Sequence, residues 1–273
     1  MTEPSMAHAS EISPAAVAPP TTARAPKSVL REYFESAVVT VIMALFGMTF
    51  VVQAVKVPTG SMQNNILIGD HLLVNKFIFA EKREGFFWRL FPYRNVRRGD
   101  VVVFKYPQNP EVNYVKRVIG LPGETVEVRG TRVFINGREL PEHRLYVQHP
   151  GFDAEDSALR IVREEPSPDS ARYRVYWESY HLDRGDANVP SGGRYAVGRP
   201  FHVPERAYFV MGDNRDDSED SRFWGTVPRD YMVGRALVVY WSYDERAAAA
   251  SGENLALKIL RYTRWRRVGT LIR

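Results

Sequence analysis

Residues 36–62 read SAVVTVIMALFGMTFVVQAVKVPTGSM, and this stretch sets the architecture that we expect of the chain. Its first part, Ser36–Val55, runs for about 20 residues without a charge, which is the length that a helix needs to cross a hydrocarbon core. Because backbone groups inside a bilayer must be bonded within their own segment, its β-branched residues do not argue against a helix. We therefore expect a transmembrane helix over residues 36–57, with Ser61 at the membrane surface just behind it.

A cleaved secretory signal is the alternative explanation of this apolar run, because Val52-Gln53-Ala54 offers small residues at suitable positions. The run exceeds the usual apolar region of a signal and follows a long tail, which favours a retained anchor. Arg24, Lys27 and Arg31 precede the run, whereas Lys56 is the one cation that follows it closely. The positive-inside rule then predicts a cytoplasmic N-terminus and an exported remainder.

The rest of the chain divides into regions of different composition. Residues 1–28 are rich in Pro, Ala, Ser and Thr, which predicts a disordered cytoplasmic tail. About 215 residues follow the apolar run, enough for one large domain with a substantial insertion. We expect a tail in 1–35, a transmembrane helix in 36–57, a β core in 58–137, a β-rich insertion in 138–205, the second part of the β core in 206–245 and a short basic helix in 246–273.

Short runs of β-branched and aromatic residues predict a mainly β domain. Asn136-Gly137 is a sequence typical of a tight hairpin turn. Strands do not alternate with long helices, which argues against a parallel α/β sheet, and Glu253–Arg267 alone has helical spacing. We expect an antiparallel β-sheet core with strands in His71–Phe79, Asp100–Tyr106, Val112–Ile119, Glu124–Arg129, Arg132–Ile135, Arg172–Trp177, Ala207–Met211 and Ala236–Tyr243.

The composition excludes several kinds of site. The chain has no cysteine, so disulfides, thiolate nucleophiles and thiolate metal sites are ruled out. Its six histidines show no metal-binding spacing such as HExxH, and we expect neither a metal nor another cofactor. The net charge of +5 suits an anionic membrane surface. No zinc-finger or RNA-binding motif accompanies that charge, so we expect no nucleic-acid partner.

Ser61 needs a base if it is to act as a nucleophile. A Ser-His-Asp triad stays open, since triads are recognised by geometry rather than by spacing, although no G-x-S-x-G motif is present. Lys116 is the other candidate, because it lies in the expected strand Val112–Ile119 among apolar neighbours, where loss of water favours the neutral amine. A structural alternative is a lysine of an edge strand whose amine reaches solvent.

The segments that contain these residues resemble the conserved boxes of bacterial type I signal (leader) peptidases. Five ordered boxes behind an apolar run are a specific match over about residues 36–243, whereas any one of them alone would be weak. The resemblance implies a membrane-bound serine endopeptidase that removes signal peptides from exported preproteins. The boxes are Thr59-Gly60-Ser61-Met62, Gly69-Asp70, RGDVVVF at 98–104, YVKRVIGLPG at 114–123 and GDNRDDSEDSR at 212–222.

The resemblance also implies roles for individual residues. Ser61 would be the nucleophile and Lys116 the general base of a Ser-Lys dyad on a mainly antiparallel β fold. The backbone N–H of Ser61 and the hydroxyl of Thr59 would form the oxyanion hole. The supporting residues would be Ser218, which orients the lysine, the ion pair of Asp220 with Arg222, and Arg117 as a structural neighbour of the lysine.

The resemblance further places a shallow apolar pocket beside the dyad. Such a pocket fits alanine and rejects larger side chains by overpacking, which suits signal peptides that end in Ala-x-Ala. The substrate would bind extended, as an added strand beside residues 112–116. The pocket residues implied are Val57, Pro58, Met62, Ile66, Tyr114 and Val115, each of which has ordinary core packing as its alternative role.

Two further segments suggest contact with membrane phospholipid. The apolar segment FFWRLFPY at 86–93 contains Arg and Pro, which favours insertion at the lipid interface over burial in the core. The basic segment Arg261–Arg267 suits anionic lipid, with a solvated helix face as the alternative. We expect an enzyme in the cytoplasmic membrane of a bacterium, with its catalytic domain on the outer, periplasmic face and signal peptides of preproteins as its substrates.

Three other functions remain open at this point. A related Ser-Lys peptidase that matures a dedicated secretion or conjugation component would share the dyad. A self-cleaving repressor of similar β fold is disfavoured, because it would lack the apolar run and contain a DNA-binding domain. A non-enzymatic, membrane-anchored β-domain would keep the strands and would be unaffected by mutation of Ser61.

Overall fold

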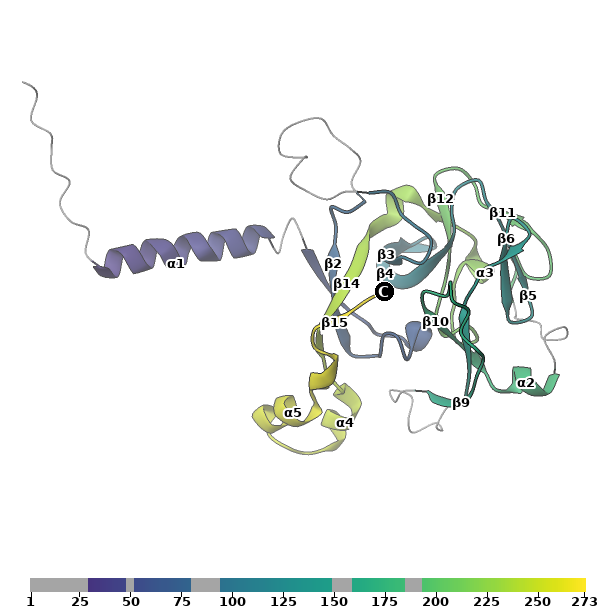
Figure 1. Cartoon of the computed structure of the whole chain (residues 1–273). Coiled ribbons are helices and arrows are strands. Elements are labelled where there is room, and N and C mark those ends of the chain that lie inside the picture. The colour runs from purple at the N-terminus through teal and green to yellow at the C-terminus, as the bar shows by residue number, and fades with distance from the viewer. Residues whose placement is uncertain (1–28, 48–51, 80–93, 149–158, 185–192) are drawn as a thin grey trace, which may run out of the picture. The chain divides into compact units, whose positions relative to one another are not determined.

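Figure 1 shows the computed structural model of the chain, which describes residues 29–47, 52–79, 94–148, 159–184 and 193–273. The chain forms two units, Met1–Ala44 and Leu45–Arg273, and each is described by itself. The tail 1–28 and the apolar segment 86–93 lie outside the described residues, so the expectations for them stay predictions.

Helix α1 (Val29–Phe46) belongs mainly to the first unit. It begins within the residues expected to form the tail, where Arg31 Nε donates to Glu35 Oε1 at 2.8 Å, one helical turn further on. Such pairs favour a helix, so the expectation of a disordered tail is wrong for residues 29–35. Among the described helices, none combines the length and the apolar character needed to cross a membrane.

The end of the expected transmembrane helix is a β-strand instead. Val52–Lys56 form β1, which pairs antiparallel with β2 (Asp70–Asn75). The expectation of a helix over the whole of 36–57 is therefore wrong at its C-terminal end. Its β-branched residues favour a β-strand. They would have to form a helix only inside a bilayer, where no partner strand is available to bond their backbone groups.

The second unit is built on an eight-stranded antiparallel sheet with the order β1-β2-β14-β3-β4-β12-β13, and β15 also pairs with β14 (Figure 1). Five of its eight strands overlap the runs of β-branched and aromatic residues that predicted strands, and the other three were not predicted. The further strands of this sheet are β3 (Val101–Tyr106), β4 (Asn109–Gly120), β12 (Ala207–Met211), β13 (Val227–Pro228), β14 (Met232–Ser242) and β15 (Thr270–Leu271).

Strand β3 lies at the centre of the core. Val101 and Val103 pack in one buried cluster, whereas Val102 and Phe104 pack in another. Successive side chains of a strand point to opposite faces, so both faces of β3 are covered and its sequence is apolar throughout. Met62 belongs to the first of these clusters, and the residue that follows Ser61 is thereby anchored in the core.

A second sheet has the order β11-β5-β6-β7 and contains the predicted hairpin. Asn136 and Gly137 connect β6 to β7 with φ values of 50° and 77°, both in the left-handed region that a tight hairpin turn requires. The strands are β5 (Thr125–Arg129), β6 (Arg132–Ile135), β7 (Arg138–Glu139) and β11 (Phe201–His202).

A third sheet, in the order β10-β8-β9, lies in residues 138–205. Its strands β10 (Arg174–Glu178) and β8 (His143–Gln148) are parallel, whereas the other pairings between labelled strands in the described part of the chain are antiparallel. Strands β8 and β9 (Arg160–Glu164) were not predicted, because their charged residues break the apolar pattern. The short helix α2 (Tyr180–Arg184) follows β10.

The C-terminal helix is shorter than the expected Glu253–Arg267. Helix α5 (Leu255–Tyr262) follows α4 (Glu245–Ala250) and ends where Thr263 adopts an extended conformation. There the Arg264 N–H donates to the Ser242 carbonyl at 2.9 Å, so the chain leaves the helix to bond with the end of β14. Residues Trp265–Arg267 form a separate 3₁₀ turn, η6, before β15.

Candidate active site

Three segments that are distant in sequence surround one cleft of about 400 Å³. They are the region around the 3₁₀ turn η2 (Gly60–Met62), residues 112–116 of β4, and the loop after β12 that contains residues 217 and 219. Ser61 and Lys116 both line this cleft. The fold thus brings together the two residues that the sequence suggested as nucleophile and base.

Two hydrogen bonds from Asn214 hold the turn that contains Ser61. The Ser61 carbonyl accepts from the Asn214 N–H at 3.1 Å, and Asn214 Nδ2 donates to the Gly60 carbonyl at 3.3 Å. A Cβ on Gly212 would overlap the Ser61 carbonyl, so a glycine is required for this close approach. Thr59 caps the turn in an extended conformation without a side-chain capping bond, and it lines the cleft.

Lys116 is enclosed by the protein, with 3% of its surface exposed. Burial lowers the pKa of its amine from 10.5 to about 8, against the opposing effect of the Asp220 carboxylate. Its Nζ lies 5.5 Å from the centre of the Tyr114 ring. A substantial fraction of this amine is therefore neutral near pH 8, which is the state that a general base requires.

Asp220 is the centre of a buried polar group beside the lysine. Its carboxylate accepts from the Ser218 hydroxyl at 2.8 Å, from the Gly212 N–H at 3.0 Å and from Arg222 Nε at 2.8 Å. Burial by itself raises the pKa of Asp220, but Arg222 and Lys116 outweigh that effect and the net pKa is lowered. The expected ion pair of Asp220 with Arg222 is present, and the Ser218 hydroxyl donates to this pair's carboxylate.

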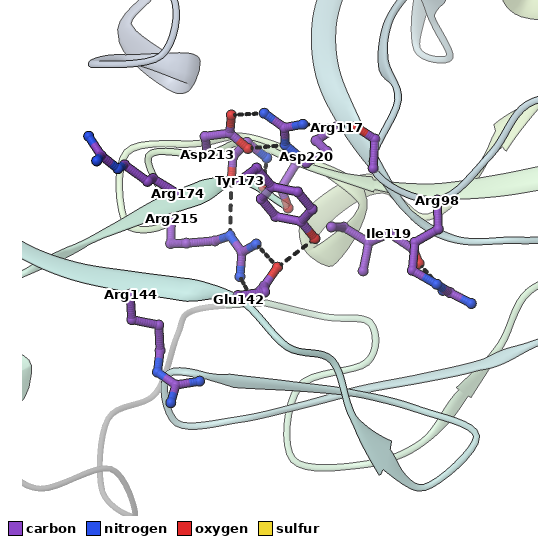
Figure 2. Close-up of polar contacts among 12 residues, drawn as sticks. Arg98, Arg117, Ile119, Glu142, Arg144, Tyr173, Arg174, Asp213, Arg215 and Asp220 are labelled. Atoms are coloured by element: carbon purple, nitrogen blue, oxygen red, sulfur yellow. Dashed lines mark hydrogen bonds and ion pairs between the residues drawn. The ribbon is translucent and has the colours of Figure 1, made fainter. Parts of the chain in front are cut away.

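Arg117 follows the lysine in β4 and so points to the opposite face of the strand. Its Nε and Nη2 donate to the two oxygens of Asp213 at 2.7 and 2.6 Å (Figure 2). Its Nη1 donates to the Gly99 carbonyl at 2.8 Å. The guanidinium carbon lies 4.1 Å from the centre of the Tyr173 ring. Arg117 thereby joins β4 to the segment that holds the Ser61 turn.

Figure 2 also shows a second buried ion pair that sequence reasoning missed. Arg215 Nη1 donates to Glu142 Oε2 at 2.8 Å, and the Tyr173 hydroxyl donates to Glu142 Oε1 at 3.0 Å. Both members of the ion pair are fully buried. Asp213 and Arg215 lie in a box of the resemblance and could have been suspected, whereas Glu142 and Tyr173 lie outside every box, and the expected strand Arg172–Trp177 gave Tyr173 no functional role.

The expected pocket residues are mostly found around the cleft. Val57, Pro58, Met62, Tyr114 and Val115 line it. Ile66 was also expected there, but it is 1% exposed and packs in the core cluster that contains Met62, so it supports the pocket from behind.

One edge of β4 is open beside the cleft. Residues 113–117 pair with β3 on one side, whereas β12 pairs on the other side with Arg117, Val118 and Gly120. Among the described residues, no strand pairs with residues 112–116 on the β12 side. An extended peptide that enters the cleft therefore meets backbone groups suited to strand addition.

Comparisons with known proteins agree in family. The family described as "Signal peptidase, peptidase S26" matches residues 30–241. The signal peptidase I of Pseudomonas aeruginosa is 33% identical over 235 residues, which cover 79% of this chain and 74% of that protein. The signal peptidase I of Leptolyngbya laminosa is 35% identical over 222 residues, covering 78% of this chain and 81% of that protein.

A crystal structure of a signal peptidase I from Enterococcus faecalis V583 is 29% identical in sequence. It covers 52% of this chain and 97% of its own, with a TM-score of 0.29. A score this low supports no conclusion about the fold.

Proposed function

The chain belongs to the signal peptidase family, peptidase S26, and is a serine endopeptidase of the signal peptidase I type, and we propose that it works through a dyad of Ser61 and Lys116. The observation that supports the dyad is that both residues line one cleft, where burial lowers the pKa of Lys116 to about 8. A histidine base has no comparable support, because no histidine among the described residues lines this cleft.

In the proposed reaction the neutral Lys116 amine removes the proton of Ser61 Oγ as that oxygen bonds to the carbonyl carbon of the substrate. The carbonyl oxygen becomes an oxyanion, which the Thr59 hydroxyl and the Ser61 N–H stabilise. When the C–N bond breaks, the Lys116 ammonium gives its proton to the leaving amine. Water then attacks the acyl carbon while Lys116 takes a proton from it. The bond from that carbon to Ser61 Oγ breaks, and the Lys116 ammonium returns the proton to Ser61 as the acid product leaves.

The buried group around Asp220 has a positioning role in this proposal. The Ser218 hydroxyl hydrogen is engaged by Asp220 at 2.8 Å, so the lone pairs of Ser218 Oγ remain to accept from the lysine amine. The Asp220–Arg222 ion pair holds Ser218 in that orientation. Its net charge near the lysine is small, so the amine keeps the lowered pKa that burial gives it.

We further propose that the substrate is the Ala-x-Ala end of a signal peptide, bound as a strand along residues 112–116. Val57, Met62 and Val115 give the cleft apolar walls, and alanine fits between such walls without overpacking. Strand addition leaves alternate side chains of the peptide facing the pocket, which matches two small residues separated by a variable one.

Membrane anchoring through the apolar stretch that precedes β1 is part of the same proposal, with the N-terminus in the cytoplasm and the β domain on the periplasmic face. Val39, Ile42 and Met43 of α1 are between 55% and 65% exposed, and lipid would cover such apolar side chains. The basic segment 261–267 would bind anionic phospholipid. Its Arg261, Arg264 and Arg267 pair with Glu253, Asp244 and Asp70, so the exposed Arg266 would be the main lipid contact.

The decisive experiment uses the full chain in detergent with a preprotein whose signal ends in Ala-x-Ala. We expect cleavage after the second alanine by wild type and by Ser170→Ala, a control at an exposed serine away from the cleft. Ser61→Ala should remain folded and give no product. Cleavage by Ser61→Ala at the wild-type rate would rule out the dyad. Cleavage of one preprotein among a diverse panel would instead favour a dedicated processing enzyme.

A further inference from the structure

The segment Asp217–Asp220 has two faces with different environments. Ser218 and Asp220 are 5% and 0% exposed, and they form the buried group beside Lys116. Asp217 and Glu219 alternate with them, are exposed, and line the cleft. Alternation is expected of an extended chain, whose successive side chains point in opposite directions. One face of the segment therefore supports the lysine, while the other is presented to whatever occupies the cleft.

The two cleft carboxylates lie at separate points. A Cβ placed on Gly60 would be 3.4 Å from Oδ2 of Asp217, so this carboxylate stands beside the residue that precedes Ser61. Glu219 lies near the aromatic wall, where its Oε1 accepts from the Tyr106 hydroxyl at 3.2 Å. Tyr106 in turn stacks on Tyr114, with ring centres 4.5 Å apart.

These carboxylates determine the charge of the cleft. The charged groups among the described residues that line it are Lys116, Asp217 and Glu219. When Lys116 is neutral, as a base must be, the described residues that line the cleft provide two carboxylates and no cationic group. An extended peptide bound in this cleft would pass both carboxylates. Apolar pockets by themselves would not distinguish peptides by the charge of side chains that point out of those pockets, whereas these carboxylates would.

We propose that Asp217 and Glu219 select substrates with a lysine or arginine close to the scissile bond and reject those with acidic residues there. This inference rests on the proposed function, because it concerns peptides bound for cleavage at Ser61. One exposed ion pair changes binding by up to about fivefold, and repulsion of an acidic residue acts in the opposite sense by a similar factor. At the best position we therefore expect kcat/KM for a lysine peptide to exceed that for its glutamate counterpart by about tenfold.

The test uses a reference peptide with an Ala-x-Ala site and uncharged flanks, in which lysine, glutamine or glutamate replaces each position between P5 and P3′ in turn. The full chain in detergent is assayed at low and high salt. We expect the order lysine, glutamine, glutamate at one or two positions, with the lysine-to-glutamate ratio falling at high salt because exposed pairs are screened. The variant Asp217→Asn/Glu219→Gln should bring that ratio close to one. Asp169→Asn, at an exposed carboxylate outside the cleft, should keep the wild-type ratio.

The lysine-to-glutamate ratio of kcat/KM tests this inference, whereas cleavage of the uncharged reference peptide tests the proposed function. Wild type that cleaves the uncharged reference peptide, but shows the same kcat/KM for lysine and glutamate at every position, would overturn the inference and leave the dyad intact. A lysine preference that persists in the double variant would overturn it equally. Failure to cleave the reference peptide at all would count against the proposed function instead.

Discussion

The pKa of Lys116 gives the sharpest quantitative prediction of the dyad. With a pKa of about 8, roughly a tenth of the amine is neutral at pH 7 and roughly nine tenths at pH 9. We therefore expect kcat/KM to rise about tenfold between these pH values, with a midpoint near 8. A histidine base would give a limb near pH 6.5 and a plateau above it.

The same pKa predicts how the lysine affects stability. The folded pKa lies below the ordinary value of 10.5, so between about 8 and 10.5 the unfolded chain binds more protons than the folded chain. The free energy of unfolding should thus rise with pH across this window. Below pH 8 the lysine is charged in both states, and its burial lowers the free energy of unfolding by the full amount that the pKa difference implies, about 3 kcal/mol. Lys116→Met removes that cost with a side chain of similar volume, and it should be more stable than wild type at pH 7 by about that amount.

The assay combines peptide cleavage with denaturation of the full chain in detergent at pH 7 and pH 9.5. Lys116→Met should be inactive and more stable at pH 7, with the gain shrinking at pH 9.5. Lys116→Arg should be inactive because a guanidinium keeps its proton at working pH. Lys105→Met, at an exposed lysine of the neighbouring strand β3, should leave activity and stability close to wild type. Processing by either Lys116 variant, or an activity limb near pH 6.5, would refute the assignment of Lys116 as the base.

Three further predictions concern the surroundings of the dyad and the topology. Thr59→Val keeps the side-chain shape and removes the hydroxyl donor, so kcat should fall by about 10²–10³, whereas Thr59→Ser should keep most activity; equal cleavage by both variants would show that the oxyanion is held elsewhere. Gly212→Ala should place a Cβ against the Ser61 carbonyl and the Ser218 hydroxyl, so we expect a lower melting temperature and a lower kcat. The control Gly137→Ala, in an exposed turn, should keep the wild-type kcat. A reporter fused after residue 250 should be active only when it is exported, and activity in the cytoplasm would contradict the proposed orientation.

Much of the β core could be predicted from local sequence. The runs that became β3, β5, β6 and β12 are short, β-branched and bounded by turn residues, and the Asn136-Gly137 turn needs only local backbone chemistry. Strand β1 was missed because its residues read equally well as the end of an apolar helix. Whether such residues form a helix or a strand depends on the availability of β2 as a partner, which no local pattern records.

The sequence by itself determined the family, and its ordered boxes suggested Ser61 and Lys116 as the dyad and Asp220 with Arg222 as an ion pair, which the structure contains. Only the tertiary structure decided which groups surround them. Burial of Lys116, and with it the lowered pKa, depends on β3, β4 and the loop after β12 packing together. The pairing of Arg215 with Glu142 joins positions far apart in sequence. Desolvation and Coulomb interactions depend on distance in space, and for such pairs the order of residues along the chain does not specify that distance.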